Sequence, residues 1–107
     1  MKIKKKNRKF KVGLNDIILK EVAKIKLNKN ELVTFVNGKS EYDVVKTNWG
    51  YYATPSINSR LKKFNIKTCI IRNKITKNIF ITLIEKNKKK IFRKYLKDEK
   101  CELLKWL

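Results

Sequence analysis

The dipeptide Asn37-Gly38 lies between two segments in which apolar and polar residues alternate, LVTFV before it and KSEYDVV after it. An Asn-Gly pair in this setting is the strongest short-range signal for a β-hairpin, because a two-residue type I′ turn needs positive φ at both central positions. The expected register pairs Val36 with Lys39. One face of the hairpin then carries five side chains: Val33, Phe35, Ser40, Tyr42 and Val44. The sequence therefore predicts two antiparallel strands over residues 32–45.

The first eleven residues are expected to form a flexible basic arm. Residues 1–11 carry seven basic and no acidic side chains, and like charges this dense repel one another and bury little apolar surface. Beyond the arm, apolar patterning and alternation in residues 10–13, 16–22 and 23–28 predict short strands that precede the hairpin.

The second half of the chain changes between helical and strand patterns. A helix is expected over residues 54–64, because Thr54 can cap the first amide groups and Pro55 fits the first helical position. The patterns further predict strands at 66–72 and 78–85, a helix at 88–97 and a strand at 101–107. The predicted fold class is α+β, with one domain over residues 12–107. In it, N-terminal antiparallel strands with the Asn-Gly hairpin are followed by the order α-β-β-α-β.

A ferredoxin-like topology is the alternative. From residue 41 the expected order is β-α-β-β-α-β, which is also the order of that fold and of RNA-recognition modules. Two observations oppose it. The first strand of that fold is central and could not also pair through the Asn37-Gly38 turn, and residues 78–85 lack the Gly-aromatic signature by which such modules stack bases.

The net charge of +20 arises from 25 lysines and four arginines against nine acidic residues. Lys, Asn and Ile have A/T-rich codons, so an AT-rich genome accounts for part of the lysine excess. A codon bias would spread the charge evenly, yet residues 12–43 carry five basic and five acidic residues, and residues 44–84 carry eight basic and none acidic. The positive charge therefore belongs to the arm and to the second half of the chain.

A concentration of positive charge of this kind is typical of proteins that bind nucleic acid or another polyanion. The expected contacts come from the arm, from the first helix and from the basic face of the second helix. The candidate polyanion-binding residues are Lys4, Lys5, Lys6, Arg8, Lys62, Lys63, Lys89, Lys90, Arg93, Lys94 and Lys97.

The segment NWGYYATPSINSRLKK, residues 48–63, is a second candidate site. It gathers aromatic and polar residues around the expected helix start, where free amide groups favour phosphate or carboxylate. The candidate ligand-binding residues are Trp49, Tyr51, Tyr52, Thr54, Ser56, Asn58 and Arg60. The competing structural interpretation is that Trp49 and one tyrosine fill the core while Thr54 caps a helix.

Composition argues against several classes of protein. The chain has no His and no CxxC motif, so neither a metal site nor a cofactor is expected, and histidine-dependent catalysis is excluded. An enzyme with Tyr or Lys as proton carrier has no supporting motif, and a non-enzymatic protein is favoured. No apolar run is long enough to span a membrane, so a cytoplasmic protein is expected. The oligomeric state is left open.

Residues 41–68, EYDVVKTNWGYYATPSINSRLKKFNIKT, resemble a stretch found in small uncharacterised bacterial proteins that are loosely associated with surface-sugar genes. The resemblance implies no activity or site residue. It supports an alternative function, a ligand-binding or accessory protein in surface-carbohydrate or nucleotide-sugar metabolism whose residues 49–60 hold a phosphate- or carboxylate-bearing sugar. The leading interpretation is a non-enzymatic module that binds a polyanion, RNA in the first place.

Overall fold

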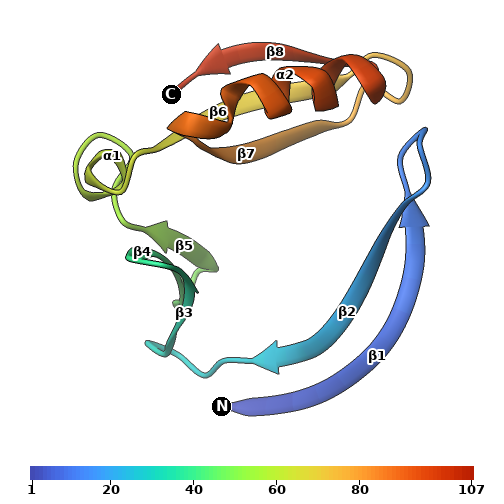
Figure 1. Ribbon diagram of the computed structural model, residues 1–107. Helices are drawn as coiled ribbons and strands as arrows, with labels where there is room; N and C mark the ends of the chain where they lie inside the picture. The colour runs from blue at the N-terminus through green and yellow to red at the C-terminus, as the bar shows by residue number, and fades with distance from the viewer. The chain divides into compact units, whose positions relative to one another are not determined.

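The computed structural model describes residues 1–107, and Figure 1 shows its eight strands and two α-helices. This mixture of strands and helices fits the α+β class in its broad sense. Contacts divide the chain into two compact units, an N-terminal unit over Met1–Pro55 and a C-terminal unit over Ser56–Leu107. The single domain expected over residues 12–107 stays a prediction.

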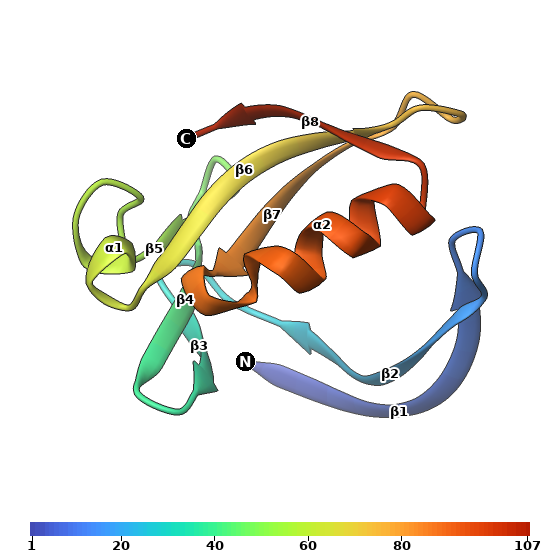
Figure 2. The same ribbon diagram turned by 45° about the horizontal axis from the view of Figure 1, so that its top comes forward.

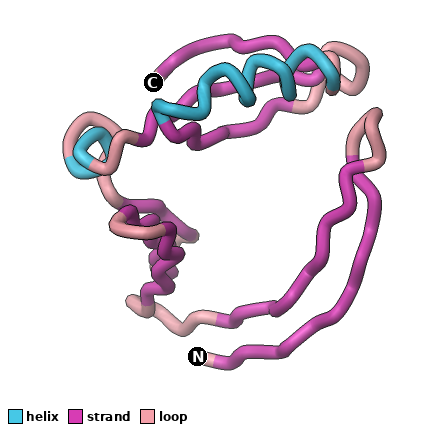
Figure 3. The backbone as a smooth tube through the Cα atoms, in the orientation of Figure 1, coloured by secondary structure: helices cyan, strands magenta, loops and turns pink.

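The N-terminal unit begins with a long antiparallel hairpin of β1 (Lys2–Val12) and β2 (Ile17–Lys26), which run side by side in Figure 3. The expectation of a flexible arm over residues 1–11 is wrong, because this segment is strand β1 almost throughout. Cross-strand pairing explains the difference. Three apolar pairs lie across the hairpin: Ile3 with Ile25, Phe10 with Leu19, and Val12 with Ile17. Such pairs stabilise a strand whose composition alone indicates disorder.

The second sheet of this unit has the order β3-β4-β5, with β3 at Leu32–Asn37, β4 at Ser40–Lys46 and β5 at Tyr51–Thr54. The predicted hairpin is confirmed, but its turn lies one residue later than predicted, so each residue of β3 pairs two positions further along β4. Asn37 pairs with Ser40, so Gly38 and Lys39 are the central turn residues. Gly38 has a φ of 60°, as a type II′ turn requires at its first central position. A shift of two positions keeps every side chain on the same face, so the five side chains predicted to share a face still do.

The helix expected from Thr54 is also wrong. Thr54 ends strand β5 and pairs with Asp43, while helix α1 spans only Arg60–Lys63. A residue before proline is extended whether it caps a helix or ends a strand, so the local signal at Thr54 does not distinguish the two structures. Pairing with β4 supplies the backbone partners that a helix would have supplied.

The C-terminal unit is a three-stranded antiparallel sheet of order β7-β6-β8, covered on one face by a helix. Its elements are β6 (Ile66–Asn73), β7 (Ile79–Glu85), the 3₁₀ turn η1 (Lys86–Lys88), α2 (Lys89–Asp98) and β8 (Cys101–Trp106). Figure 2 shows α2 lying along the sheet. The core between them consists of Cys69, Ile71, Ile84 and Leu96. The order α-β-β-α-β predicted for this half is confirmed.

The sheet memberships exclude the ferredoxin-like alternative. Strand β4 is bonded on both sides by β3 and β5, whereas β6 lies in a different sheet between β7 and β8. The ferredoxin-like order needs the strands before and after the first helix in one sheet. Neither α2 nor α1 is long and apolar enough to cross a membrane.

Substitution of Ile71 tests which face of the β7-β6-β8 sheet holds the core. Its side chain is 2% exposed, whereas that of Ile81, on the other face, is 68% exposed. Ile71→Ala is expected to lower the free energy of unfolding by about 2–5 kcal/mol, because it leaves a cavity in a small core. The control Ile81→Ala should change it by no more than about 0.5 kcal/mol. Urea denaturation measures both, and equal losses would contradict this placement of the core.

Candidate functional site

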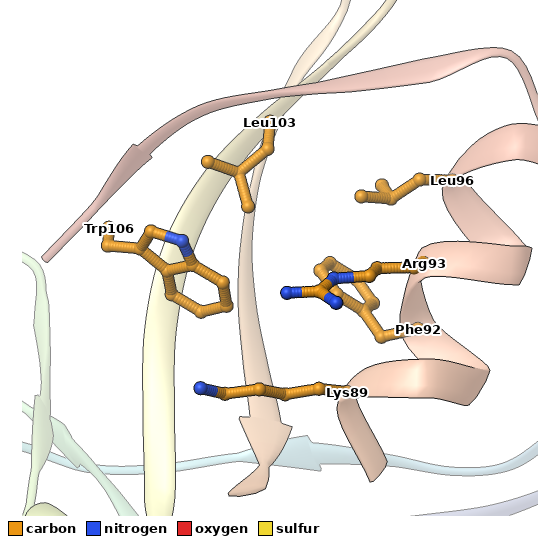
Figure 4. A pocket seen from close by; sticks show the side chains of 6 residues that line it. All are labelled: Lys89, Phe92, Arg93, Leu96, Leu103 and Trp106. Carbon is orange, nitrogen blue, oxygen red and sulfur yellow. The ribbon is translucent and has the colours of Figure 1, made fainter.

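A cavity of about 260 Å³ lies between α2 and β8 in the C-terminal unit. Figure 4 shows the side chains of α2 facing those of β8 across it. The lining residues are Lys89, Phe92, Arg93 and Leu96 from the helix, and Leu103 and Trp106 from the strand. The floor is apolar and aromatic, while the two cations lie on the helix side of the cavity.

The helix contributes its four residues through its periodicity. Positions i, i+3, i+4 and i+7 lie on one face of an α-helix, and Lys89 to Leu96 follow that spacing. The same face carries Leu96 into the core, where it is buried, and leaves Phe92 half-buried above it. The cavity is therefore an open extension of the hydrophobic core.

The strand contributes its two residues through a β-bulge. Leu103 and Trp106 are three apart, which would place them on opposite faces of a regular strand. Along β6, Ile70 pairs with Lys105 but Ile71 pairs with Leu103, so β8 contains one extra residue at this point. A bulge reverses the alternation of the strand that carries it. Both side chains consequently face α2.

Three cations surround the Trp106 indole. The Nζ atoms of Lys67 and Lys89 lie 5.3 Å and 5.7 Å from the centroid of a Trp106 ring, within cation–π range. Arg93 lines the same cavity. The first turn of α2 has no acidic residue, although the positive end of a helix dipole favours one there. The site thus concentrates positive charge without a carboxylate.

Other cations of the same unit do have acidic partners. Arg72 donates to Glu102 across β6 and β8, with a distance of 2.8 Å from its Nε, and this bond holds the pKa of Glu102 below its usual value. Lys94 donates to Asp98 at 2.6 Å on the exposed side of α2. No carboxylate pairs with Lys67, Lys89 or Arg93, a property that they share with most lysines of the unit.

Repulsion within the cluster perturbs Lys89. The nearby ammonium of Lys67 lowers the pKa of Lys89 below its ordinary value of 10.5, and desolvation, Arg93 and Lys86 act in the same direction. All the charged groups that act on Lys89 are cations. A phosphate or carboxylate between them would relieve this repulsion.

A second concentration of charge lies on one face of the β1–β2 hairpin. Strand β2 alternates, so Lys20, Lys24 and Lys26 share a face. Their partners on β1 are also lysines: Lys9 is opposite Lys20, Lys4 opposite Lys24, and Lys2 opposite Lys26. With Lys11 these exposed residues form what we call the lysine face. Like charges directly opposite on neighbouring strands destabilise a sheet.

The acidic residues of the hairpin lie elsewhere. Glu21 is on the opposite face, where it pairs with Arg8 at 3.3 Å, and Asp16 is in the turn between the strands. The Arg8 guanidinium also lies 4.5 Å from the centroid of the Phe10 ring. The lysine face therefore has no carboxylate on it.

The predicted polyanion-binding residues are divided among several surfaces. Of the arm residues, Lys4 is on the lysine face, Lys5 is on the opposite face, Lys6 is in the β1 bulge, and Arg8 is paired with Glu21. Lys62 and Lys63 are exposed on α1. Of the α2 residues, Lys89 and Arg93 line the cavity, whereas Lys90, Lys94 and Lys97 are exposed outside it.

The predicted ligand-binding residues divide between the two units. In the N-terminal unit, Trp49 is 71% exposed and stacks on Tyr52 with ring centroids 6.1 Å apart, so it does not fill the core. Tyr51 is exposed beside the Lys46 ammonium, and Thr54 belongs to β5. In the C-terminal unit, three residues of the set are exposed, namely Ser56, Asn58 and Arg60. The helix start that connected these residues is absent, and a ligand-binding role for them stays a prediction.

Sequence reasoning missed most of the cavity. Trp106 and Leu103 were expected only as part of a strand, and Lys67 only as one of many lysines. A signal was present for the helix residues, because Phe92 and Leu96 share a stripe that Lys89 and Arg93 flank. No sequence signal reveals the bulge in β8.

Removing Lys67 tests the repulsion at the cavity. Lys67→Gln is expected to raise the melting temperature at low salt, because Lys89 then loses its nearest like charge, and the gain should shrink at high salt. In the unchanged protein the unfolded chain binds more protons just below pH 10.5, so stability should rise with pH there, and less so in the variant. Thermal unfolding monitored by circular dichroism measures both effects. The control is Lys90→Gln, on the exposed side of α2, and an equal gain there would contradict this account.

Comparisons of the chain with protein-family models, with curated proteins and with solved structures found no match. The resemblance of residues 41–68 to small bacterial proteins associated with surface-sugar genes stays a prediction.

Proposed function

We propose that the protein is a non-enzymatic module that binds a polyanion, and that this polyanion is RNA. The observation that supports it best is the set of three cross-strand lysine pairs on the lysine face. Each pair places two positive charges directly opposite each other, at a cost to the stability of the hairpin. A chain of phosphates along the hairpin turns that repulsion into attraction.

The arrangement suits contacts to a phosphate backbone rather than to bases. The lysine face offers ammonium groups, which bind phosphates as flexible point charges. The other β2 residues on this face, Ile18 and Val22, are aliphatic and cannot form hydrogen bonds with base edges. Binding at this face is therefore electrostatic and independent of sequence.

The cavity of the C-terminal unit adds a second cationic surface of different character. Its three cations accompany a tryptophan and a phenylalanine, the combination by which proteins hold single strands. A module with a phosphate-binding hairpin and an aromatic cavity suits single-stranded RNA better than a base-free polyanion. The alternative function in surface-carbohydrate metabolism relies on residues 49–60 and on neither of these surfaces.

Replacing one lysine pair tests the role of the lysine face. The double variant Lys9→Gln/Lys20→Gln is expected to weaken binding to a single-stranded RNA oligomer and to reduce the slope of log Kobs against log salt by about 1.4. Each lysine that contacts a phosphate of a single strand contributes about 0.7 to that slope. Fluorescence anisotropy of a labelled oligomer over a salt series measures the slope.

The matched control is Lys29→Gln/Lys39→Gln, which removes two charges from turns outside the β1–β2 hairpin. Its slope should stay close to that of the unchanged protein. A slope near zero for the unchanged protein would refute polyanion binding altogether. Equal reductions in the two double variants would refute a particular role for the lysine face.

A further inference from the structure

We infer that the cavity between α2 and β8 takes one unstacked nucleotide of a single-stranded nucleic acid, with its base on the Trp106 indole and its phosphate among Lys67, Lys89 and Arg93. This inference rests on the proposed function and adds to it a defined subsite. It concerns the C-terminal unit alone, since every residue involved belongs to β6, α2 or β8.

The size and lining of the cavity favour a single flat ring. Its volume of about 260 Å³ is just below the range of roughly 300–1,000 Å³ that is usual for drug-sized ligands, so a base fits and a large cofactor does not. The walls are Phe92, Leu96, Leu103 and Trp106. None of these can read the edge of a base except through the one indole N–H, so the site accepts different bases by stacking.

The three cations at the cavity favour a ligand whose ring is joined to an anionic group. An apolar ring alone would leave three cations at the cavity without a partner. A nucleotide supplies both parts, because its phosphate is joined to the base through the sugar and can remain at the solvent side. Figure 4 shows Lys89 and Arg93 extending from the first two turns of α2 toward Trp106.

Binding requires only side-chain movement. In the structure the two lysine ammonium groups lie over the Trp106 indole, as described above. Both stems have four rotatable carbons, so a phosphate can draw the ammonium groups toward itself and expose the indole to a base. The nucleotide thus replaces two weak cation–π contacts by charge-assisted hydrogen bonds and one stacking contact.

The experiment uses the fluorescence of Trp106 in the full chain. Trp49 is the only other tryptophan, so a Trp49→Phe background reports Trp106 alone. A single-stranded oligouridylate is expected to quench this fluorescence, because a base stacks on the indole. An abasic oligomer of the same length, which keeps the phosphates, should bind more weakly and leave the fluorescence unchanged.

Two variants separate stacking from charge. Trp106→Leu should weaken binding of the oligouridylate about 5- to 150-fold, the range expected for one base–aromatic stack, whereas Trp106→Phe should retain most of the affinity. Lys89→Gln should weaken binding more than Lys90→Gln, which removes the same charge from the same helix outside the cavity. Heparin has no bases, and its binding should be unaffected by Trp106→Leu, while far-ultraviolet circular dichroism checks that the variant is folded.

Failure of this inference and failure of the proposed function give different results. If Trp106→Leu leaves the affinity for oligouridylate unchanged, or if the abasic oligomer binds equally well, the subsite is refuted while polyanion binding stands. If uridine monophosphate alone quenches Trp106 as tightly as the oligomer does, the ligand is a free nucleotide and the single-strand assignment is overturned. If neither RNA nor heparin binds in a salt-dependent way, the proposed function itself fails.

Discussion

Hydrogen bonding between neighbouring strands is the interaction on which this structure depends. Only six apolar residues are buried in the whole chain, so side-chain packing contributes little outside the face of the sheet that α2 covers. Strand β6 is central to the C-terminal unit, with β7 bonded along one side and β8 along the other. Strand β6 positions the cavity, because β8 pairs with it opposite α2 and because Lys67 belongs to it.

The chain's dependence on pairing explains which elements the sequence could predict. The Asn37-Gly38 hairpin and the order of elements after residue 55 follow from turn chemistry and local alternation, and both are confirmed. The residues before Val12 look disordered when taken alone, and they become a strand through partners that lie between 7 residues away, for Lys11 with Ile18, and 24 residues away, for Lys2 with Lys26. Thr54 satisfies the local rule for a helix cap, but pairing with Asp43 prevails over it.

The candidate site shows the same difference between local sequence signals and pairing with remote segments. The helical spacing of Phe92 and Leu96 was visible in the sequence, as was the basic stripe beside them. The cavity also needs Trp106 to face them, and this depends on the extra residue that β8 inserts between Leu103 and Lys105. A bulge depends on register against another strand and has no local signature here. The close approach of Lys67 to Lys89 is likewise a tertiary property, because the two residues are remote in sequence.

The positions of the lysines, rather than their number, are the basis for the proposed binding of an anion. A lysine-rich codon bias explains why the hairpin contains many lysines, but it gives no reason for three pairs of them to lie directly opposite each other. On the opposite face Glu21 neutralises Arg8, as is usual for an exposed strand pair. On the lysine face three pairs are left facing each other, and at the cavity Lys67 and Lys89 repel each other beside Trp106. Stability alone favours the exchange of one lysine in each pair for a neutral or acidic residue. An anionic ligand of the kind proposed would reverse the sign of these energies if it spanned the pairs.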